Sequence, residues 1–105
     1  MLYKIRPMKS RQEILDLLED NREKIKTFGV RELGLFGSVA RDEQTEDSDV
    51  DVLVELEKET FDAYMGLLFF LEELFGRKVD LAIKDSIKPL IKGRILSETI
   101  YVKGL

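Results

Sequence analysis

The residues of this chain whose types and spacing could perform chemistry are Gly37, Ser38, Asp49 and Asp51. Ten residues separate the Gly-Ser pair from Asp49, which opens the apolar run DVDVLV. Side chains alternate across a β-strand, so carboxylates two residues apart should lie on the same face. Paired carboxylates beside a turn of small residues can bind Mg²⁺ and nucleotide phosphates together. The spacing therefore predicts a phosphate-handling enzyme.

Each half of this pattern also has a structural explanation. Half-exposed strands alternate polar and apolar residues in the same way, so Asp49 and Asp51 could simply lie on the solvent-facing side of an acidic edge strand. Aspartate is nevertheless depleted in strands, and two in one strand need a reason. Gly37 allows the backbone to approach a phosphate closely, and the Ser38 hydroxyl could bind its oxygens. A Gly-Ser pair can equally be a plain turn after a strand.

A third acid, Asp80, lies on the minority face of the aliphatic segment 78–83. If that segment pairs beside the strand of Asp51, the acids converge on one spot. Clustered carboxylates raise one another's pKa unless cations neutralise them, which favours a metal site. The alternative is a surface aspartate, either unpaired or paired with Arg77 or Lys78.

Arg41 follows Gly37 closely enough to reach a triphosphate or the acids. Its alternative is a structural ion pair with Asp42, Glu46 or Asp47. We interpret Glu43, Glu46 and Asp47 as a solvated loop face rather than as ligands.

Composition excludes several other chemistries. The chain of 105 residues has no Cys and no His, so disulfides, thiolate catalysis and imidazole bases are absent. Its formal net charge of −4 does not favour direct nucleic-acid binding. The N-terminal segment has no signal-peptide apolar core, and no apolar run approaches membrane-spanning length. We expect a soluble, cytoplasmic protein with a single domain over residues 1–105.

The elements that must position these residues are predicted from periodicity and capping. A capping box at Ser10–Glu13 should start a helix that Gly29 ends. The aromatic-rich helix from Thr60 to Phe75 should end at Gly76 and be either deeply buried or covered by a partner. We interpret Tyr3, Tyr64 and Tyr101 as half-buried packing residues. The other predicted elements are strands at 31–36, 49–54, 78–83 and 100–102, a helical turn at 39–42 and a helix at 87–98 that holds Pro89 in its first turn. This order predicts one small α/β layer fold.

The wider pattern, FGSVARDEQTEDSDVDVLVEL followed by KVDLAI, resembles the DNA polymerase beta-like nucleotidyltransferase superfamily and its minimal nucleotidyltransferase (MNT) branch. The resemblance implies a small single-domain nucleotidyltransferase fold, with a mixed β-sheet packed against helices. It implies that Asp49, Asp51 and Asp80 are catalytic and bind Mg²⁺. Gly37, Ser38 and Arg41 would bind the nucleotide, ATP.

Many members of this branch are antitoxins of HEPN/MNT toxin–antitoxin pairs. The resemblance implies transfer of AMP from ATP to a hydroxyl, expected to be a tyrosine, of a partner HEPN ribonuclease toxin, with a possible hetero-oligomer. A chain of this length has little material left for an acceptor-binding domain, which favours an acceptor that brings its own surface. Two alternatives stay open. One is nucleotidyl transfer to a small hydroxyl compound, with a second subunit completing the pocket. The other is a non-enzymatic antitoxin that acts by direct binding.

Overall fold

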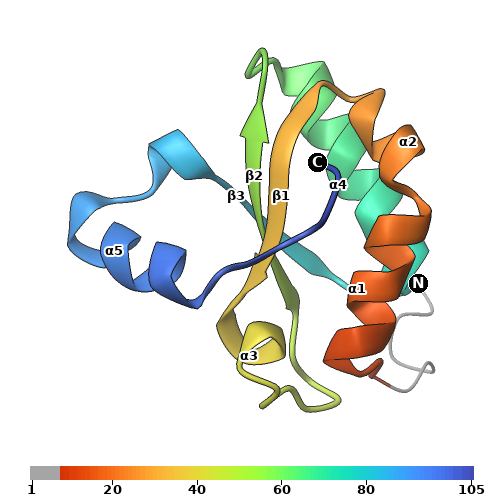
Figure 1. The fold of residues 1–105 in the computed structure, drawn as a ribbon, viewed down its shortest axis with the longest axis vertical. Coiled ribbons are helices and arrows are strands. Elements are labelled where there is room, and N and C mark those ends of the chain that lie inside the picture. Colours follow the sequence, from red (N-terminus) through yellow and green to blue (C-terminus); the bar gives the residue numbers. More distant parts are fainter. Residues whose placement is uncertain (1–7) are drawn as a thin grey trace.

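A computed structural model describes residues 8–105, and its helices and strands alternate along the chain (Figure 1). The elements are α1 (Arg11–Asp20), α2 (Arg22–Lys26), β1 (Val30–Phe36), α3 (Gly37–Ala40), β2 (Val50–Leu56), α4 (Phe61–Phe75), β3 (Val79–Ile83), the 3₁₀ turn η2 (Lys84–Ser86), α5 (Pro89–Glu98) and β4 (Ile100–Tyr101).

Within the described residues, the strands form one mixed sheet in the order β3-β2-β1-β4. The pairs β1–β2 and β1–β4 are antiparallel, whereas β2 and β3 run parallel because α4 carries the chain back between them. This is the small α/β fold with a mixed sheet that the sequence predicts. Its order also removes the acidic edge-strand alternative, because β2 lies between β3 and β1.

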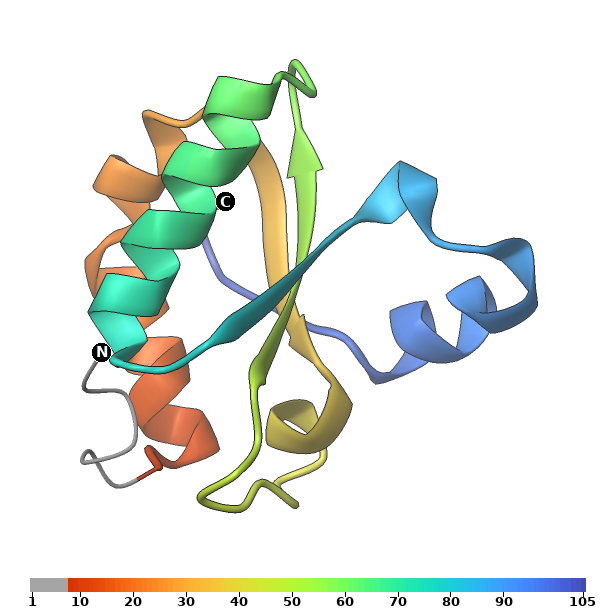
Figure 2. The ribbon, with the colours of Figure 1, turned by 180° about the vertical axis from the view of Figure 1, so that it is seen from behind.

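The core lies between one face of the sheet and helices α1, α2 and α4, which Figures 1 and 2 show together on that side. From β2 it takes Val50, Val52 and Val54, each with no exposed surface. The alternation of β2 thus places its valines in the core and Asp51 on the opposite face. The helices contribute a stripe of large apolar side chains that are fully or almost fully buried: Ile14, Leu18, Ile25, Leu67, Leu71 and Phe75.

The N-terminal helix begins as predicted and ends early. The Ser10 hydroxyl accepts a hydrogen bond from the Glu13 N–H, and the Glu13 carboxylate accepts one from the Ser10 N–H, so the capping box is present. The single helix up to Gly29 is wrong, because the chain turns at Asn21 into α2. The Asn21 amide donates to the Leu17 carbonyl at 2.8 Å, the local competition with helical bonding that makes Asn a poor interior residue. Gly29 has φ +80°, as its expected terminating role requires.

Helix α4 has the predicted bounds and a mixed environment. Thr60 caps its start, and Gly76, with φ +65°, ends it. One face packs into the core, while Phe61 is 76% exposed and Phe69 is 60% exposed. The helix is therefore not deeply buried all round.

The three tyrosines have different outcomes. Tyr64 is half-buried, as expected, and its hydroxyl donates to the Leu81 carbonyl at 2.6 Å. Tyr101 is 41% exposed, so the expectation fails there, because the two-residue β4 is an edge strand with no further strand beside it. Tyr3 lies outside the described residues.

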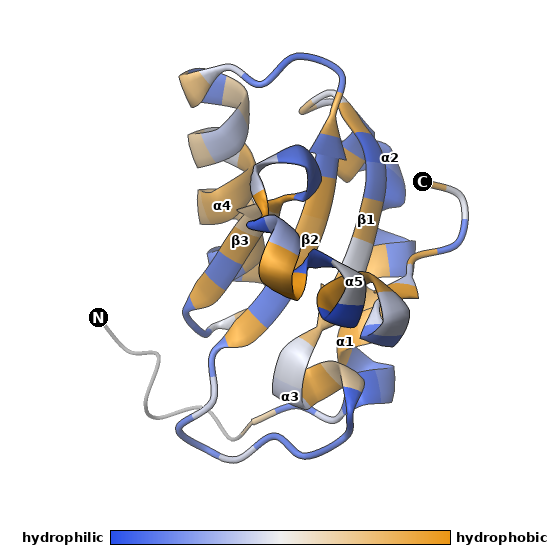
Figure 3. Cartoon of the chain, turned by 90° about the vertical axis from the view of Figure 1, so that its left-hand side faces the viewer, coloured by the Kyte–Doolittle hydropathy of each residue, from blue (hydrophilic) through white to orange (hydrophobic). Residues whose placement is uncertain are grey.

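Helix α5 lies on the other side of the sheet, over the face that carries the acids. Figure 3 looks onto this face, with α5 in front of the strands. The loop that leads to α5 is tied down by Lys84, whose ammonium lies 3.0 Å from the Glu32 carboxylate of β1. The helix begins at Pro89, two residues later than predicted, since Pro fits the first helical position. We call this side the open face, meaning the face of the sheet to which Asp51 and Asp80 belong.

Among the helices of residues 8–105, none is both long and apolar enough to cross a lipid bilayer. The single domain over 1–105 stays a prediction, because residues 1–7 lie outside the described part.

Candidate functional site

Strand register brings the predicted acids together on the open face. Asp51 in β2 pairs directly with Asp80 in parallel β3 and with Phe36, the last residue of β1, on its other side. Laterally paired residues point to the same face of a sheet, so both carboxylates lie beside the point where the chain enters Gly37. Asp49 is exposed and immediately precedes β2.

The electrostatics of Asp51 reflect this crowding. The pKa of its carboxyl is raised from 3.8 to about 6, chiefly by burial and then by the neighbouring charges of Asp80 and Asp49. Glu98 adds to the rise, and the Arg41 guanidinium opposes it. A half-buried carboxylate that other acids surround is costly without a counter-charge. Such an arrangement is typical of a functional site rather than of a structural ion pair.

Gly37 is required where it stands. Its φ is +70°, a conformation that side-chain-bearing residues rarely adopt. A Cβ on Gly37 would collide with the Asp51 carboxylate, so the backbone and this acid are in direct contact. Ser38 is half-buried in the short helix α3 that follows. Gly37 therefore lies directly against Asp51, and Ser38 follows it at the start of α3.

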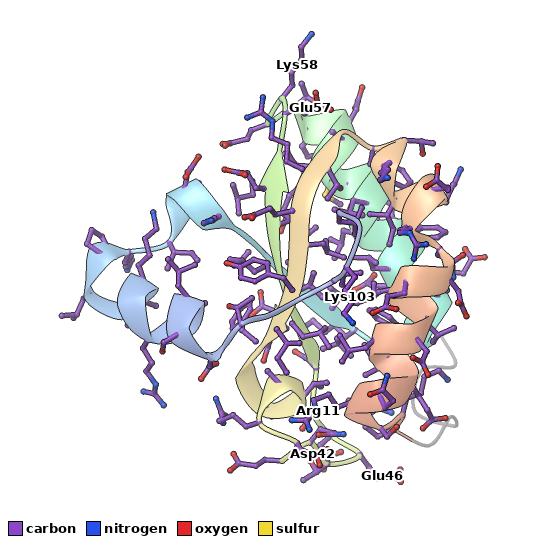
Figure 4. All side chains as sticks on the ribbon, in the orientation of Figure 1. Arg11, Asp42, Glu46, Glu57, Lys58 and Lys103 are labelled. Atoms are coloured by element: carbon purple, nitrogen blue, oxygen red, sulfur yellow. The ribbon has the colours of Figure 1, made fainter. Side chains whose placement is uncertain are left out.

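The position of α3 is fixed from the N-terminal helix. The Arg11 guanidinium donates to the Ala40 carbonyl at 2.9 Å, which satisfies the last turn of α3. Figure 4 shows Arg11 of α1 near Asp42, which follows α3 at the same end of the molecule. Asp42 has φ +60° and so makes the left-handed turn out of α3.

Arg41 is bound to acids other than those expected. It pairs with Glu43 at 2.9 Å and with Glu98, at the end of α5, at 3.1 Å. The alternative pairings with Asp42, Glu46 or Asp47 are absent from the ion pairs of the described residues. Glu43, Glu46 and Asp47 are exposed, as expected of a solvated loop face, and Glu43 also pairs with Arg41 because the turn at Asp42 folds the two together. These pairs raise the pKa of Arg41, with Glu43 the larger cause.

Glu98 is the site residue that sequence reasoning missed. Its carboxylate accepts a hydrogen bond from the Gly37 N–H at 2.7 Å, although 61 positions separate the two residues. Nothing local in the sequence marks Glu98. The only available signal is the short closing strand, because its pairing of Tyr101 with Gly34 carries the preceding residues across the end of β1.

The carboxylates of Asp49, Asp51 and Asp80 are suitable ligands for a hard cation, but they are not arranged as a metal site. Carboxylate oxygens are the ligands that Mg²⁺ takes in proteins. Across residues 8–105, however, no group of three or more acidic side chains is arranged to hold a metal ion as it stands. The charges of Asp80 and Asp49 contribute to the raised pKa of Asp51, so a bound cation would relieve repulsion among these carboxylates. Asp49 and Asp80 are exposed, so burial does not hold either side chain in a fixed position.

Comparison with known proteins gives a family match over most of the chain. Residues 14–102 match the family model described as a nucleotidyltransferase domain. The chain is similar to the protein adenylyltransferase MntA of Thermococcus cleftensis, with 42% identity over 93 residues, covering 87% of this chain and 94% of that protein.

Solved structures give the same fold. The structure of a candidate minimal nucleotidyltransferase is similar at a TM-score of 0.68 and 35% identity, covering 82% of this chain and 93% of that one. A toxin–antitoxin structure with AMP-PNP is similar at a TM-score of 0.65 and 22% identity, covering 92% of this chain and 75% of that one. A chain from a complex of tri-AMPylated Shewanella oneidensis HEPN toxin with MNT antitoxin is similar at a TM-score of 0.62 and 19% identity, covering 87% of this chain and 73% of that one. At the identities of these last two, the likeness concerns the fold alone.

Proposed function

Because the chain belongs to the nucleotidyltransferase domain family, we propose that it transfers AMP from ATP and does so on the open face of its sheet. The family makes it an enzyme of nucleotidyltransferase type. The single observation that carries the location is the register: Asp51 pairs with Asp80 on one side and lies against Gly37 on the other. An acid cluster and a phosphate-accessible backbone are thereby adjacent.

We assign the binding of the nucleotide phosphates to the Gly37 N–H, the Ser38 hydroxyl and the Arg41 guanidinium. The Gly37 N–H and the Arg41 guanidinium already bind the Glu98 carboxylate, so both are positioned to bind an anion. We assign a divalent cation, expected to be Mg²⁺, to Asp49, Asp51 and Asp80. When bound, it would neutralise phosphate charge and so help the leaving group depart.

The proposed reaction needs few groups from the protein. An acceptor hydroxyl oxygen attacks the α-phosphorus of ATP, the bond from that phosphorus to the bridging oxygen of the β-phosphate breaks, and pyrophosphate leaves. The hydroxyl proton passes to a carboxylate, for which Asp80 on the edge strand β3 is the accessible candidate. In a chain without histidine, a carboxylate is the available base near the site.

We propose that the acceptor is a hydroxyl, expected to be a tyrosine, of a partner HEPN toxin, which this transfer silences. A relative at 42% identity is named as a protein adenylyltransferase, and a similarly folded antitoxin is in complex with an AMPylated HEPN toxin. Phe61 and Phe69 of α4 are 76% and 60% exposed, so this helix offers apolar side chains to a protein partner. A cytoplasmic location, as for an enzyme that uses ATP, belongs to the same proposal.

Isotopic labelling tests this function. The protein is incubated with Mg²⁺, the protein encoded by the adjacent gene, and ATP labelled at either the α- or the γ-phosphate. AMP transfer predicts protein-bound label from the α-position and none from the γ-position. Label from the γ-position would indicate phosphoryl transfer, and label from neither on an active toxin would favour the direct-binding alternative. A small hydroxyl compound as acceptor predicts α-label in the small-molecule fraction.

Asp49→Asn combined with Asp51→Asn separates catalysis from binding in the same assay. The account predicts loss of label with the fold retained. A matched control is Asp47→Asn, which removes a charge from the exposed loop. If the double variant still neutralised the toxin as well as the parent, neutralisation would not depend on transfer.

A further inference from the structure

Glu98 binds the same two groups that the proposed function assigns to phosphate. Its Oε2 accepts the hydrogen bond of the Gly37 N–H at 2.7 Å. Its Oε1 lies 3.1 Å from Nη1 of Arg41, and its Oε2 lies 3.3 Å from the same nitrogen. The carboxylate therefore bridges a backbone donor and a guanidinium, as a phosphate group with two oxygens can do.

The surroundings otherwise disfavour a carboxylate at this position. Glu98 is the last residue of α5, where the helix dipole is negative and repels an anion. Its charge is also close enough to Asp51 to raise the pKa of that acid. The side chain is 19% exposed, so water compensates only in part. The contacts with Gly37 and Arg41 are thus what hold Glu98 in place.

Backbone packing delivers Glu98 to this position. A Cβ on Gly34 would lie 2.5 Å from Cγ2 of Thr99, so only a glycine in β1 lets the end of α5 approach so closely. The Thr99 hydroxyl then donates to the Ile95 carbonyl at 2.6 Å and ends the helix. Tyr101 pairs with Gly34 immediately afterwards. Glu98 therefore directly precedes a segment that is anchored to β1, and movement of its side chain alone would release the donors.

We propose that Glu98 is an intramolecular substitute for a nucleotide phosphate, occupying the Gly37 and Arg41 donors in the free protein until a nucleoside triphosphate displaces it. The inference rests on the proposed nucleotide site and adds a residue that lowers its affinity. Glu98 stabilises the empty site by satisfying its donors. Because it must be displaced, it raises the concentration of triphosphate needed to half-saturate the site. The part of the ligand that competes is the polyphosphate, not the nucleoside.

Binding measurements on Glu98→Gln test the proposal. Isothermal titration in Mg²⁺ compares a non-hydrolysable ATP analogue, inorganic triphosphate and adenosine. A glutamine keeps the shape but replaces charge-assisted hydrogen bonds by weaker neutral ones, so both polyphosphates should bind about fivefold more tightly or better. Adenosine should bind with unchanged affinity.

The charge-matched control is Glu55→Gln. Glu55 lies in β2 on the same face as Asp51, four residues away, and is not among the hydrogen-bond or ion-pair partners of Gly37 or Arg41 in the described part of the chain. A rise in affinity confined to Glu98→Gln supports displacement, whereas an equal rise in both variants would reduce the effect to net charge and overturn it. Unchanged or weaker polyphosphate binding by Glu98→Gln would also overturn it. Absence of binding by the parent and both variants would instead overturn the proposed nucleotide site itself.

A second measurement does not depend on any variant. In the nuclear magnetic resonance spectrum of the ¹⁵N-labelled parent, the signals of the Gly37 amide and of Arg41 Nη1, the two groups that contact Glu98, should both shift on addition of inorganic triphosphate. Signals that stay in place while others shift would show that the triphosphate binds elsewhere and leaves Glu98 on its donors.

Discussion

Replacing Asp51 by Asn should stabilise the ligand-free protein at neutral pH although it removes a proposed catalytic group. The pKa of Asp51 is raised from 3.8 to about 6 by burial and by the charges of Asp80 and Asp49. Between these values the folded protein binds the proton more tightly than the unfolded chain, so stability falls as pH rises through this window. Below pH 3.8 the penalty is absent, and above about pH 6 it is fully present. An amide carries no charge at either pH.

The size of the effect follows from the shift. A rise of about two pKa units corresponds to an upper limit of about 3 kcal/mol at about 1.4 kcal/mol per unit. Asp51 is half-buried, so solvent screening reduces this to about 1–2 kcal/mol. Urea unfolding followed by circular dichroism in the presence of EDTA measures it, with Asp51→Asn expected to be more stable at pH 7.5 and equal to the parent near pH 3.5.

Two results would refute this reasoning. The first is an Asp51→Asn variant that is no more stable than the parent at pH 7.5, because the carboxylate would then carry no electrostatic penalty. The second is a gain in stability of the same size at both pH values, because a gain that does not depend on pH cannot come from the titration of Asp51. Asp47→Asn, in the exposed loop, is the control and should change stability by less than about 0.5 kcal/mol at either pH.

Three further substitutions test the geometry around the site. Gly37→Ala should destabilise the protein by about 1–3 kcal/mol in thermal unfolding and abolish transfer, because φ is +70° and the new methyl meets the Asp51 carboxylate. Asp42→Gly should stabilise by about 0.5–1 kcal/mol with transfer unchanged, since φ is +60° there; a loss of stability would contradict this. Gly34→Val should displace Thr99 and the end of α5, detectable in hydrogen exchange as loss of protection of the Val102 amide, which donates to the Leu33 carbonyl at 2.8 Å, whereas unchanged protection would show that the close packing is tolerated.

Much of the fold is predictable because local signals agree with the packing. The valine alternation of β2, the Ser10 capping box and the glycines that end α4 and precede β1 each act over a few residues. The early end of α1 was missed because apolar periodicity continues past Asn21, while the break depends on one side-chain hydrogen bond to Leu17. Periodicity reports which face is buried and does not report such a bond.

The site itself is predictable only in part. The spacing of Gly37, Asp49 and Asp51 is local, and the convergence with Asp80 needs only the assumption that β3 pairs beside β2. The pairing of Arg41 with Glu98 is different, because it depends on α5 crossing the open face and on β4 pairing with β1. Contacts of this kind are set by the tertiary path of the chain, which no nearby residue pattern encodes.

The most direct test of the central claim is the intact mass of the proposed HEPN-type partner after incubation with this chain, ATP and Mg²⁺. The account predicts a gain of one or more AMP units that disappears when Asp49 and Asp51 are both replaced by Asn. An unmodified partner that the chain nevertheless inactivates, or a gain that survives the double substitution, would contradict it.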